Sequence, residues 1–331
     1  MRNVNKDLSG SLVELDQAAT PEVTHPFDVR VKIAATGVCR TDLHIISGLL
    51  PVGVPHVLGH ENAGWVDQVG SMVTTVKIGD PVVCFPFVSN GLSTTERRGL
   101  DTNAPNRVTP GINAPGGYAE YLLTNERAVI KVPETADLCD LATLTDAGLA
   151  AYRACKRASK LLGVGDTAII IGIGGLGHLA VQILQSISTA DIVAVDNKLE
   201  ALAMATSFGI RTTCLSQDLT ETYRGKATVV LDFVGTNSTS AAGLECLAFG
   251  GTYFVIGAEG SVTATMLDLI ANEIHIEGIY VGTYSELQEV THLALSGQIQ
   301  PHIQKYDLED ADQALRDLLN GKIIGRAVLI P

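Results

Sequence analysis

Two candidate metal ligands and two carboxylates lie close together in a glycine-rich stretch near the start of the chain. Cys39 offers a thiolate and His60 an imidazole, which are ligand types that zinc prefers. Asp42 and Glu61 could orient these ligands from behind, because a metal-bound imidazole usually donates its second N–H group to an acceptor. The alternative is a surface cysteine among ordinary glycine turns.

The same stretch contains groups that could move a proton. Thr41 and His44 supply a hydroxyl and a titratable ring, which are enough for a short proton relay. His44 could instead be an ordinary loop histidine. Together with the candidate ligands, these residues predict acid–base chemistry at a metal.

A second glycine-rich stretch predicts dinucleotide binding. It has the pattern G-x-G-x-x-G, formed by Gly172, Gly174, Gly175, Leu176 and Gly177. The stretch follows a predicted apolar strand and opens a predicted helix. In that context the glycines allow a tight turn, close approach of a pyrophosphate and packing of helix on strand.

Asp196 ends the next predicted strand, 19 residues after Gly177. A carboxylate there can accept hydrogen bonds from the ribose hydroxyls and repels a 2′-phosphate, so it favours NAD over NADP. It could equally cap the helix that follows, and both roles can hold at once.

The elements that position these residues fall into two regions, which differ in the periodicity of their apolar residues. Residues 11–133 are typical of short strands, with one helix predicted around 41–47. Residues 166–282 alternate apolar strands with helices, which predicts a parallel sheet covered on both faces. Asp146 stands where the pattern changes from alternation to helical spacing. The chain is therefore expected to be α/β, with a mostly β first domain.

The motifs also resemble a known family. C-x-T-D-x-H at 39–44 and G-H-E-x-x-G at 59–64 are similar to the zinc-containing medium-chain alcohol dehydrogenases. The match continues through Gly70, Val73, Lys77, Gly79 and Asp80. The resemblance implies a GroES-like catalytic domain over 1–147 and a Rossmann NAD-binding domain over 148–283. It also implies that 284–331 returns to the catalytic domain.

The resemblance implies a catalytic zinc with three protein ligands and one open position. The family's commonest third ligand is a Cys where this chain has Asp146, and some secondary-alcohol dehydrogenases use Asp there. A Cys39–His60–Asp146 site is therefore expected, with Glu61 as the next candidate and more often placed behind the ligands. Asp146 could instead cap the helix beginning near Gly148.

Many relatives bind a second, structural zinc through four cysteines in a lobe that corresponds to residues 85–116. This chain has no Cys between Cys84 and Cys139, so the structural zinc is predicted to be absent. Packing or a subunit contact is expected to hold this long, turn-rich segment instead.

Further cofactor contacts are implied by position in the family. Arg40 and Arg326 match arginines that approach the cofactor pyrophosphate, and the backbone of Ile279 and Val281 would face the nicotinamide amide. In the implied mechanism zinc acts as a Lewis acid on the alcohol oxygen, and the proton leaves through Thr41 to His44. Hydride then passes to the nicotinamide ring.

The predicted function is reversible oxidation of a primary or secondary alcohol with NAD. Apolar residues near the metal loops favour an apolar substrate: Leu49, Leu50, Trp65, Phe85 and Phe87. The alternatives are a zinc-free medium-chain quinone or enoyl reductase, a polyol dehydrogenase, and a nucleotide-binding sensor that has lost catalysis. The metal-binding residues disfavour the zinc-free reductases.

Composition limits the partners. The chain of 331 residues has a formal net charge of −13, which argues against a nucleic-acid surface. It has no apolar run long enough for a membrane span, and its start lacks the apolar core of a secretory signal. The six cysteines show no paired spacing, so free thiols in a cytoplasmic protein are expected. The family resemblance implies a homodimer or homotetramer.

Overall fold

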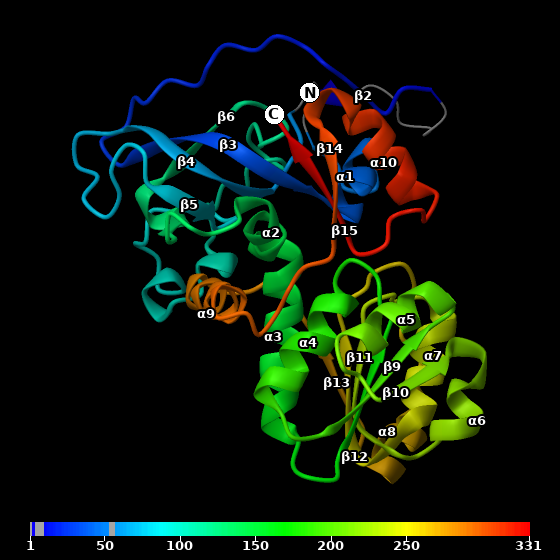
Figure 1. Ribbon diagram of the computed structural model, residues 1–331. Coiled ribbons are helices and arrows are strands. Elements are labelled where there is room, and N and C mark those ends of the chain that lie inside the picture. Colours follow the sequence, from blue (N-terminus) through cyan, green and yellow to red (C-terminus); the bar gives the residue numbers. More distant parts are fainter. Residues whose placement is uncertain (1, 4–9, 53–56) are drawn as a thin grey trace. The chain divides into compact units, whose positions relative to one another are not determined.

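The computed structural model describes residues 2–3, 10–52 and 57–331 (Figure 1). Two compact units make up the chain. The first comprises Met1–Ala147, Thr283–Leu295 and Pro301–Pro331, and the second comprises Gly148–Gly282 and Ser296–Gln300. In the part of the chain that the structure describes, no helix is long and apolar enough to cross a membrane.

A seven-stranded sheet forms the centre of the first unit. Its strands are β3 (Asp28–Val38), β4 (Glu61–Val69), β5 (Pro81–Cys84), β6 (Tyr121–Asn125), β7 (Val129–Lys131), β14 (Ile303–Asp307) and β15 (Arg326–Ile330). The order is β14-β15-β3-β4-β5-β7, and β6 pairs with β3 outside this path. The C-terminal strand β15 pairs antiparallel with β3, so the last strand of the chain joins the sheet that leads to Cys39.

Two short strands and four helices also belong to this unit. They are β1 (Arg2–Asn3), β2 (Val13–Glu14), α1 (Arg40–Ile46), α2 (Leu138–Ala142), α9 (Tyr284–Leu295) and α10 (Ala311–Leu319). Leu43 and Ile46 of α1 are buried in one cluster with Ala314 and Leu315 of α10. This packing fixes α1, the helix that directly follows Cys39.

The sequence predicts short strands over residues 11–133, but β6 begins only at Tyr121. The residues before it form a loop, because Gly116, Gly117 and Tyr118 donate backbone N–H groups to the carbonyls of Val57, Gly59 and Leu58. Glycine is required there, since a Cβ at Gly116 would lie 2.4 Å from the Gly59 oxygen. The segment is thus built against the loop that carries His60.

The second unit is an all-parallel, six-stranded sheet. Its strands are β8 (Thr167–Ile171), β9 (Asp191–Asp196), β10 (Thr212–Leu215), β11 (Ala227–Asp232), β12 (Leu247–Val255) and β13 (His275–Gly278). Its helices are α3 (Leu149–Ala158), α4 (Gly177–Ile187), α5 (Leu199–Ser207), α6 (Leu219–Tyr223), α7 (Asn237–Cys246) and α8 (Met266–Asn272). The order β10-β9-β8-β11-β12-β13 is that of a doubly wound dinucleotide-binding sheet, with its topological switch point between β8 and β11.

Most strands of this sheet match the predicted ones, since their buried apolar runs are continuous. Periodicity does not predict β10, α6 and α8, because each is short and much of β10 and α8 is exposed. Ser296–Gln300 also differs from the expected return to the first domain. The Gln182 amide explains this, because it donates to the Gln300 carbonyl at 3.1 Å and accepts from the Gln300 N–H at 2.9 Å.

Candidate metal centre

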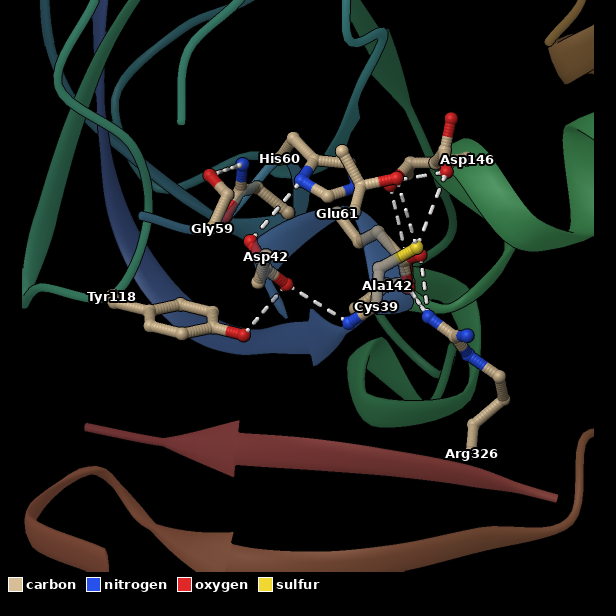
Figure 2. Close-up of polar contacts among 12 residues, drawn as sticks. Cys39, Asp42, Gly59, His60, Glu61, Tyr118, Ala142, Asp146 and Arg326 are labelled. Carbon is tan, nitrogen blue, oxygen red and sulfur yellow. Dashed lines mark hydrogen bonds and ion pairs between the residues drawn. The ribbon is translucent and has the colours of Figure 1, made fainter. Parts of the chain in front are cut away.

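Four potential metal ligands converge in the first unit. Ligand atoms of Cys39, His60, Glu61 and Asp146 all lie within 4.8 Å of one another (Figure 2). The antiparallel pairing of β3 with β4 places Gly37 opposite Glu61, which brings the Cys39 and His60 loops to one end of the sheet. The centre is therefore produced by strand register.

Asp146 joins this group from a π-helical turn, Leu144–Gly148. Its Oδ2 atom lies 3.6 Å from His60 Nε2 and 4.0 Å from Cys39 Sγ. The structure does not show Asp146 capping the next helix, because α3 begins at Leu149 with Gly148 as its N-cap and has no side-chain cap. A π-turn re-aims side chains locally and is common at functional sites.

Asp42 organises the centre from behind. Its carboxylate is fully buried, and Oδ2 accepts hydrogen bonds from the Cys39 N–H and the Tyr118 hydroxyl, both at 2.9 Å. Its Oδ1 lies 3.5 Å from His60 Nδ1. The imidazole is thereby oriented with Nε2 towards Asp146. Sequence reasoning missed Tyr118, because its segment was interpreted only as a strand.

The buried carboxylates and the thiol of the centre favour a positive charge between them. Burial by itself lowers the pKa of His60, but Asp42, Asp146 and Cys39 raise it well above its ordinary value. Both ring nitrogens are buried and complete no hydrogen bond of normal geometry. Buried nitrogen, sulfur and oxygen donors with unmet polar groups fit a zinc ion, which would replace a proton on the imidazole.

Glu61 is held by a second buried group. Both of its carboxylate oxygens accept from the Arg326 guanidinium, and both side chains are almost fully buried (Figure 2). Burial raises the pKa of Glu61 to about 7, while Arg326 acts in the opposite direction. Arg326 is 4% exposed, and the pyrophosphate contact that the family resemblance implies for it stays a prediction.

Gly37 makes this pair possible. A Cβ at Gly37 would lie 1.9 Å from Glu61 Oε2, so no other residue leaves room for the carboxylate in this position. The sequence shows the glycine, but it does not show that the Glu61 carboxylate requires one at this position.

The predicted relay residues lie on α1. Thr41 Oγ1 is 3.5 Å from Cys39 Sγ, and His44 is half-buried one turn further along the helix. Arg40 is exposed in the first turn. Their roles in proton transfer and cofactor binding stay predictions.

The glycine motif of the second unit has the shape that a pyrophosphate requires. Gly172 has a φ of +88°, and a Cβ at Gly177 would lie 1.7 Å from the Gly172 oxygen. A Cβ at Gly174 would meet nothing within 4 Å, so this glycine faces open space. Gly172 thus suits the tight turn, Gly177 the packing of helix on strand, and Gly174 the close approach of a pyrophosphate.

Asp196 lies beside this motif. Its Oδ2 accepts from the Ile173 N–H at 2.7 Å, and its Oδ1 accepts from the Lys198 N–H at 2.9 Å. The residue is half-buried, which leaves part of the carboxylate open to solvent. After β13, Val281 has a φ of +43°, which is strained for a β-branched residue, while the contacts predicted for Ile279 and Val281 stay predictions.

Side chains within the chain hold the lobe over 85–116. Glu96 accepts from the backbone N–H groups of Gly91 and Ser93 at 2.6 and 2.8 Å. Arg127 pairs with Asp101 at 3.0 Å. Among the residues that the structure describes, no group of potential metal ligands other than the four above was found.

The residues suggested for an apolar pocket differ in exposure. Phe85 and Phe87 are buried and meet edge to face at 5.5 Å, and Phe85 also packs against Tyr284 at 5.9 Å. Leu49, Trp65 and Leu50 are 70%, 45% and 36% exposed. The two phenylalanines therefore belong to an aromatic cluster, whereas the other three lie on the surface.

Comparison with known proteins gives concordant matches along the chain. Two family models match, described as "Alcohol dehydrogenase GroES-like domain" over 25–134 and "Zinc-binding dehydrogenase" over 175–296. An NAD-dependent alcohol dehydrogenase of Saccharolobus solfataricus is 32% identical, with 100% of each chain covered. An alcohol dehydrogenase crystal structure from Aeropyrum pernix superposes with a TM-score of 0.95 and 35% identity, covering 100% of this chain and 99% of the other. A D-arabinose dehydrogenase from Sulfolobus solfataricus gives a TM-score of 0.83 and 28% identity, covering 94% and 95%.

Proposed function

Because this chain belongs to the zinc-binding medium-chain alcohol dehydrogenase family, we propose that it is an NAD-dependent alcohol dehydrogenase. It interconverts an apolar primary or secondary alcohol and the corresponding aldehyde or ketone. The observation that carries the proposal is the convergence of Cys39, His60 and Asp146, with ligand atoms inside 4.8 Å.

Cys39, His60 and Asp146 would hold the metal. Their sulfur, nitrogen and oxygen donors suit zinc, which acts when bound as a Lewis acid on the substrate oxygen. The ion pair of Glu61 with Arg326 supports a role behind the three ligands, which would leave one position for substrate. Asp42 keeps the imidazole oriented, because its carboxylate is fixed by the Cys39 N–H and the Tyr118 hydroxyl.

Thr41 and His44 would carry the proton away. The Thr41 hydroxyl lies beside the Cys39 sulfur. His44 is on the same helix and is half-buried, so its ring is partly accessible to solvent. A hydroxyl can accept and pass on a proton without holding charge, and a histidine ring exchanges protons near neutral pH.

The second unit would bind the dinucleotide, which accepts hydride when bound. Gly174 leaves space for the pyrophosphate, and the N-terminus of α4 favours its negative charge. The partly open Asp196 carboxylate would accept from the ribose hydroxyls and favours NAD. Arg40 and the backbone of Ile279 and Val281 are assigned further contacts by family position.

One zinc per chain is proposed. The lobe over 85–116 has no cysteine. Two of its carboxylates make other contacts: Glu96 accepts from backbone N–H groups of the lobe, and Asp101 pairs with Arg127.

The protein is further proposed to form a homodimer or homotetramer in the cytoplasm. Strand β13 is an edge of the second unit's sheet, and Met266, Leu267 and Ile270 of α8 are 82%, 74% and 75% exposed. An apolar patch beside a sheet edge suits association with a second copy. Six free cysteines suit a reducing compartment.

The test combines zinc analysis of dialysed protein with NADH absorbance over a panel of alcohols, polyols and sugars. We expect about one zinc per chain and turnover of apolar alcohols in the wild type. Asp146→Ala should lose or weaken zinc and activity together, whereas the exposed Asp310→Ala control should change neither. About two zinc ions would overturn the single site. Zinc-free protein that still reduces carbonyl compounds would indicate a zinc-free reductase, and polyol preference would overturn the apolar substrate.

A further inference from the structure

A fully buried carboxylate lies at the end of β11 in the second unit. Asp232 Oδ1 accepts from the backbone N–H groups of Val234 and Gly235 at 2.8 and 2.9 Å. Its Oδ2 accepts from the Tyr253 hydroxyl at 2.6 Å. These three donors compensate for the removal of the carboxylate from water. The side chain thus fixes the loop over 233–236 to strand β12.

The backbone of the same residue fixes a second loop. The Asp232 carbonyl accepts from the N–H groups of Ile256 and Gly257 at 3.1 and 2.9 Å. The two loops are in direct contact, because a Cβ at Gly235 would lie 2.1 Å from the Gly257 carbonyl carbon. Asp232 is therefore the point where the loops after β11 and β12 are joined.

The first of these loops also contacts the glycine motif. A Cβ at Gly172 would lie 2.5 Å from Val234 Cγ2, so Val234 packs on the first glycine. The loop follows β11, which borders the switch point between β8 and β11. Ligands of doubly wound sheets bind outside the carboxyl ends of the strands at that point. A shift of this loop would change the surface offered to a dinucleotide.

An open pocket of about 260 Å³ borders the two loops, lined in part by Gly235, Ser240, Tyr253 and Gly257. The side of the loops that faces this pocket has fewer protein atoms to pack against, so the hydrogen bonds of Asp232 contribute to the rigidity of the loops. Burial and the neighbouring carboxylate raise the pKa of Tyr253, which keeps its hydroxyl protonated as a donor.

We propose that Asp232 and Tyr253 are positioning residues for the dinucleotide. They hold the loop over 233–236 in its binding conformation before the cofactor arrives, and so remove an ordering cost from binding. The proposal rests on the proposed function for the identity of the ligand. Tyr253 acts through Asp232 and needs no contact with the cofactor.

The test uses the full-length zinc-loaded protein with Tyr253→Phe, which removes only the hydroxyl. The Kd for NADH, measured by fluorescence titration, is expected to rise about threefold to tenfold. The kcat should stay within about twofold and the zinc content should not change, because the loop acts on binding. Tyr223→Phe is the matched control, since Tyr223 packs against the same unit's core at α6, and it should leave the Kd unchanged.

A second variant and a second measurement keep the outcome clear. Asp232→Asn should weaken NADH at least as much, and amide exchange over 233–236 should speed up in both variants and slow again with NADH. A lowered Tm with an unchanged Kd in Tyr253→Phe would reduce the pair to a structural role and overturn the proposal. Wild-type protein that binds no NADH would instead overturn the proposed function itself, a result that the wild-type titration alone reveals.

Discussion

Replacing Glu96 by Gln tests whether one carboxylate holds the lobe where relatives place a structural zinc. Its two oxygens accept from different backbone N–H groups, those of Gly91 and Ser93 at 2.6 and 2.8 Å. Hydrogen bonds from Ser93 and Ser89, followed by the backbone bonds, lower the pKa of Glu96 to about 2. The residue is 6% exposed, so water cannot replace the carboxylate freely.

The magnitude follows from the acceptors that are lost. A glutamine keeps one carbonyl oxygen, so one backbone N–H faces an amide NH₂ group and has no acceptor. An unsatisfied buried donor costs about 1–3 kcal/mol. Taking about 2 kcal/mol, the opening equilibrium of the lobe should rise roughly 30-fold.

The assay is hydrogen exchange of peptides from the lobe, read by mass spectrometry. Faster exchange is expected around 88–108 in Glu96→Gln, with the rest of the first unit unchanged. The exposed Glu134→Gln is the control for loss of one negative charge. Equal exchange in wild type and Glu96→Gln would refute the reasoning.

The same carboxylate gives a pH dependence with a defined sign. Its folded pKa is depressed below the ordinary value of 4.5 to about 2. Its stabilisation is therefore present above about pH 4.5 and is lost as pH falls towards 2. After correction for intrinsic exchange, lobe opening should increase over this window in the wild type more than in Glu96→Gln. Parallel curves for the two proteins would contradict this assignment.

Two further predictions concern the centre and the cofactor. Gly37→Ala places a Cβ 1.9 Å from Glu61 Oε2, which forces the carboxylate away from Arg326. This change should lower the Tm and should lower the zinc affinity about tenfold, as measured by competition with a chelator. A variant with wild-type zinc affinity would show that the Glu61–Arg326 pair does not support the site. Asp196→Ala removes the acceptor of the Ile173 and Lys198 N–H groups and the proposed ribose contact. It should raise the KM for NAD about tenfold and reduce the preference for NAD over NADP in kcat/KM, and an unchanged preference would leave Asp196 only a loop-holding role.

Much of the fold was predictable because it follows from local patterns of apolar residues and glycines. Continuous apolar runs separated by helical spacing predicted the parallel sheet, and the glycine motif between β8 and α4 predicted its ligand. Short, exposed elements such as β10, α6 and α8 were missed, because they bury too little apolar surface to leave a periodic signal.

The chemistry of the centre was also indicated by residue type. Cys39, His60 and Asp146 were expected together from their motifs, and the structure brings their ligand atoms into one group with Glu61. Which of them bind the metal stays a prediction. The sequence by itself therefore indicated which donors could converge and, through the family resemblance, the class of reaction that they suit.

Only the tertiary structure decided what surrounds those donors. Arg326 is 265 residues from Glu61 in the sequence and reaches it because β15, β3 and β4 are neighbours in one sheet. Tyr253 reaches Asp232 because β12 and β11 are neighbours in the other sheet, whereas Tyr118 reaches Asp42 because its loop is hydrogen-bonded to Leu58, next to the loop that carries His60. Strand periodicity specifies which face a side chain takes, but not which distant strand lies beside it or in what register. Partners of buried charges are fixed by that register, and so they become visible only when the chain is folded.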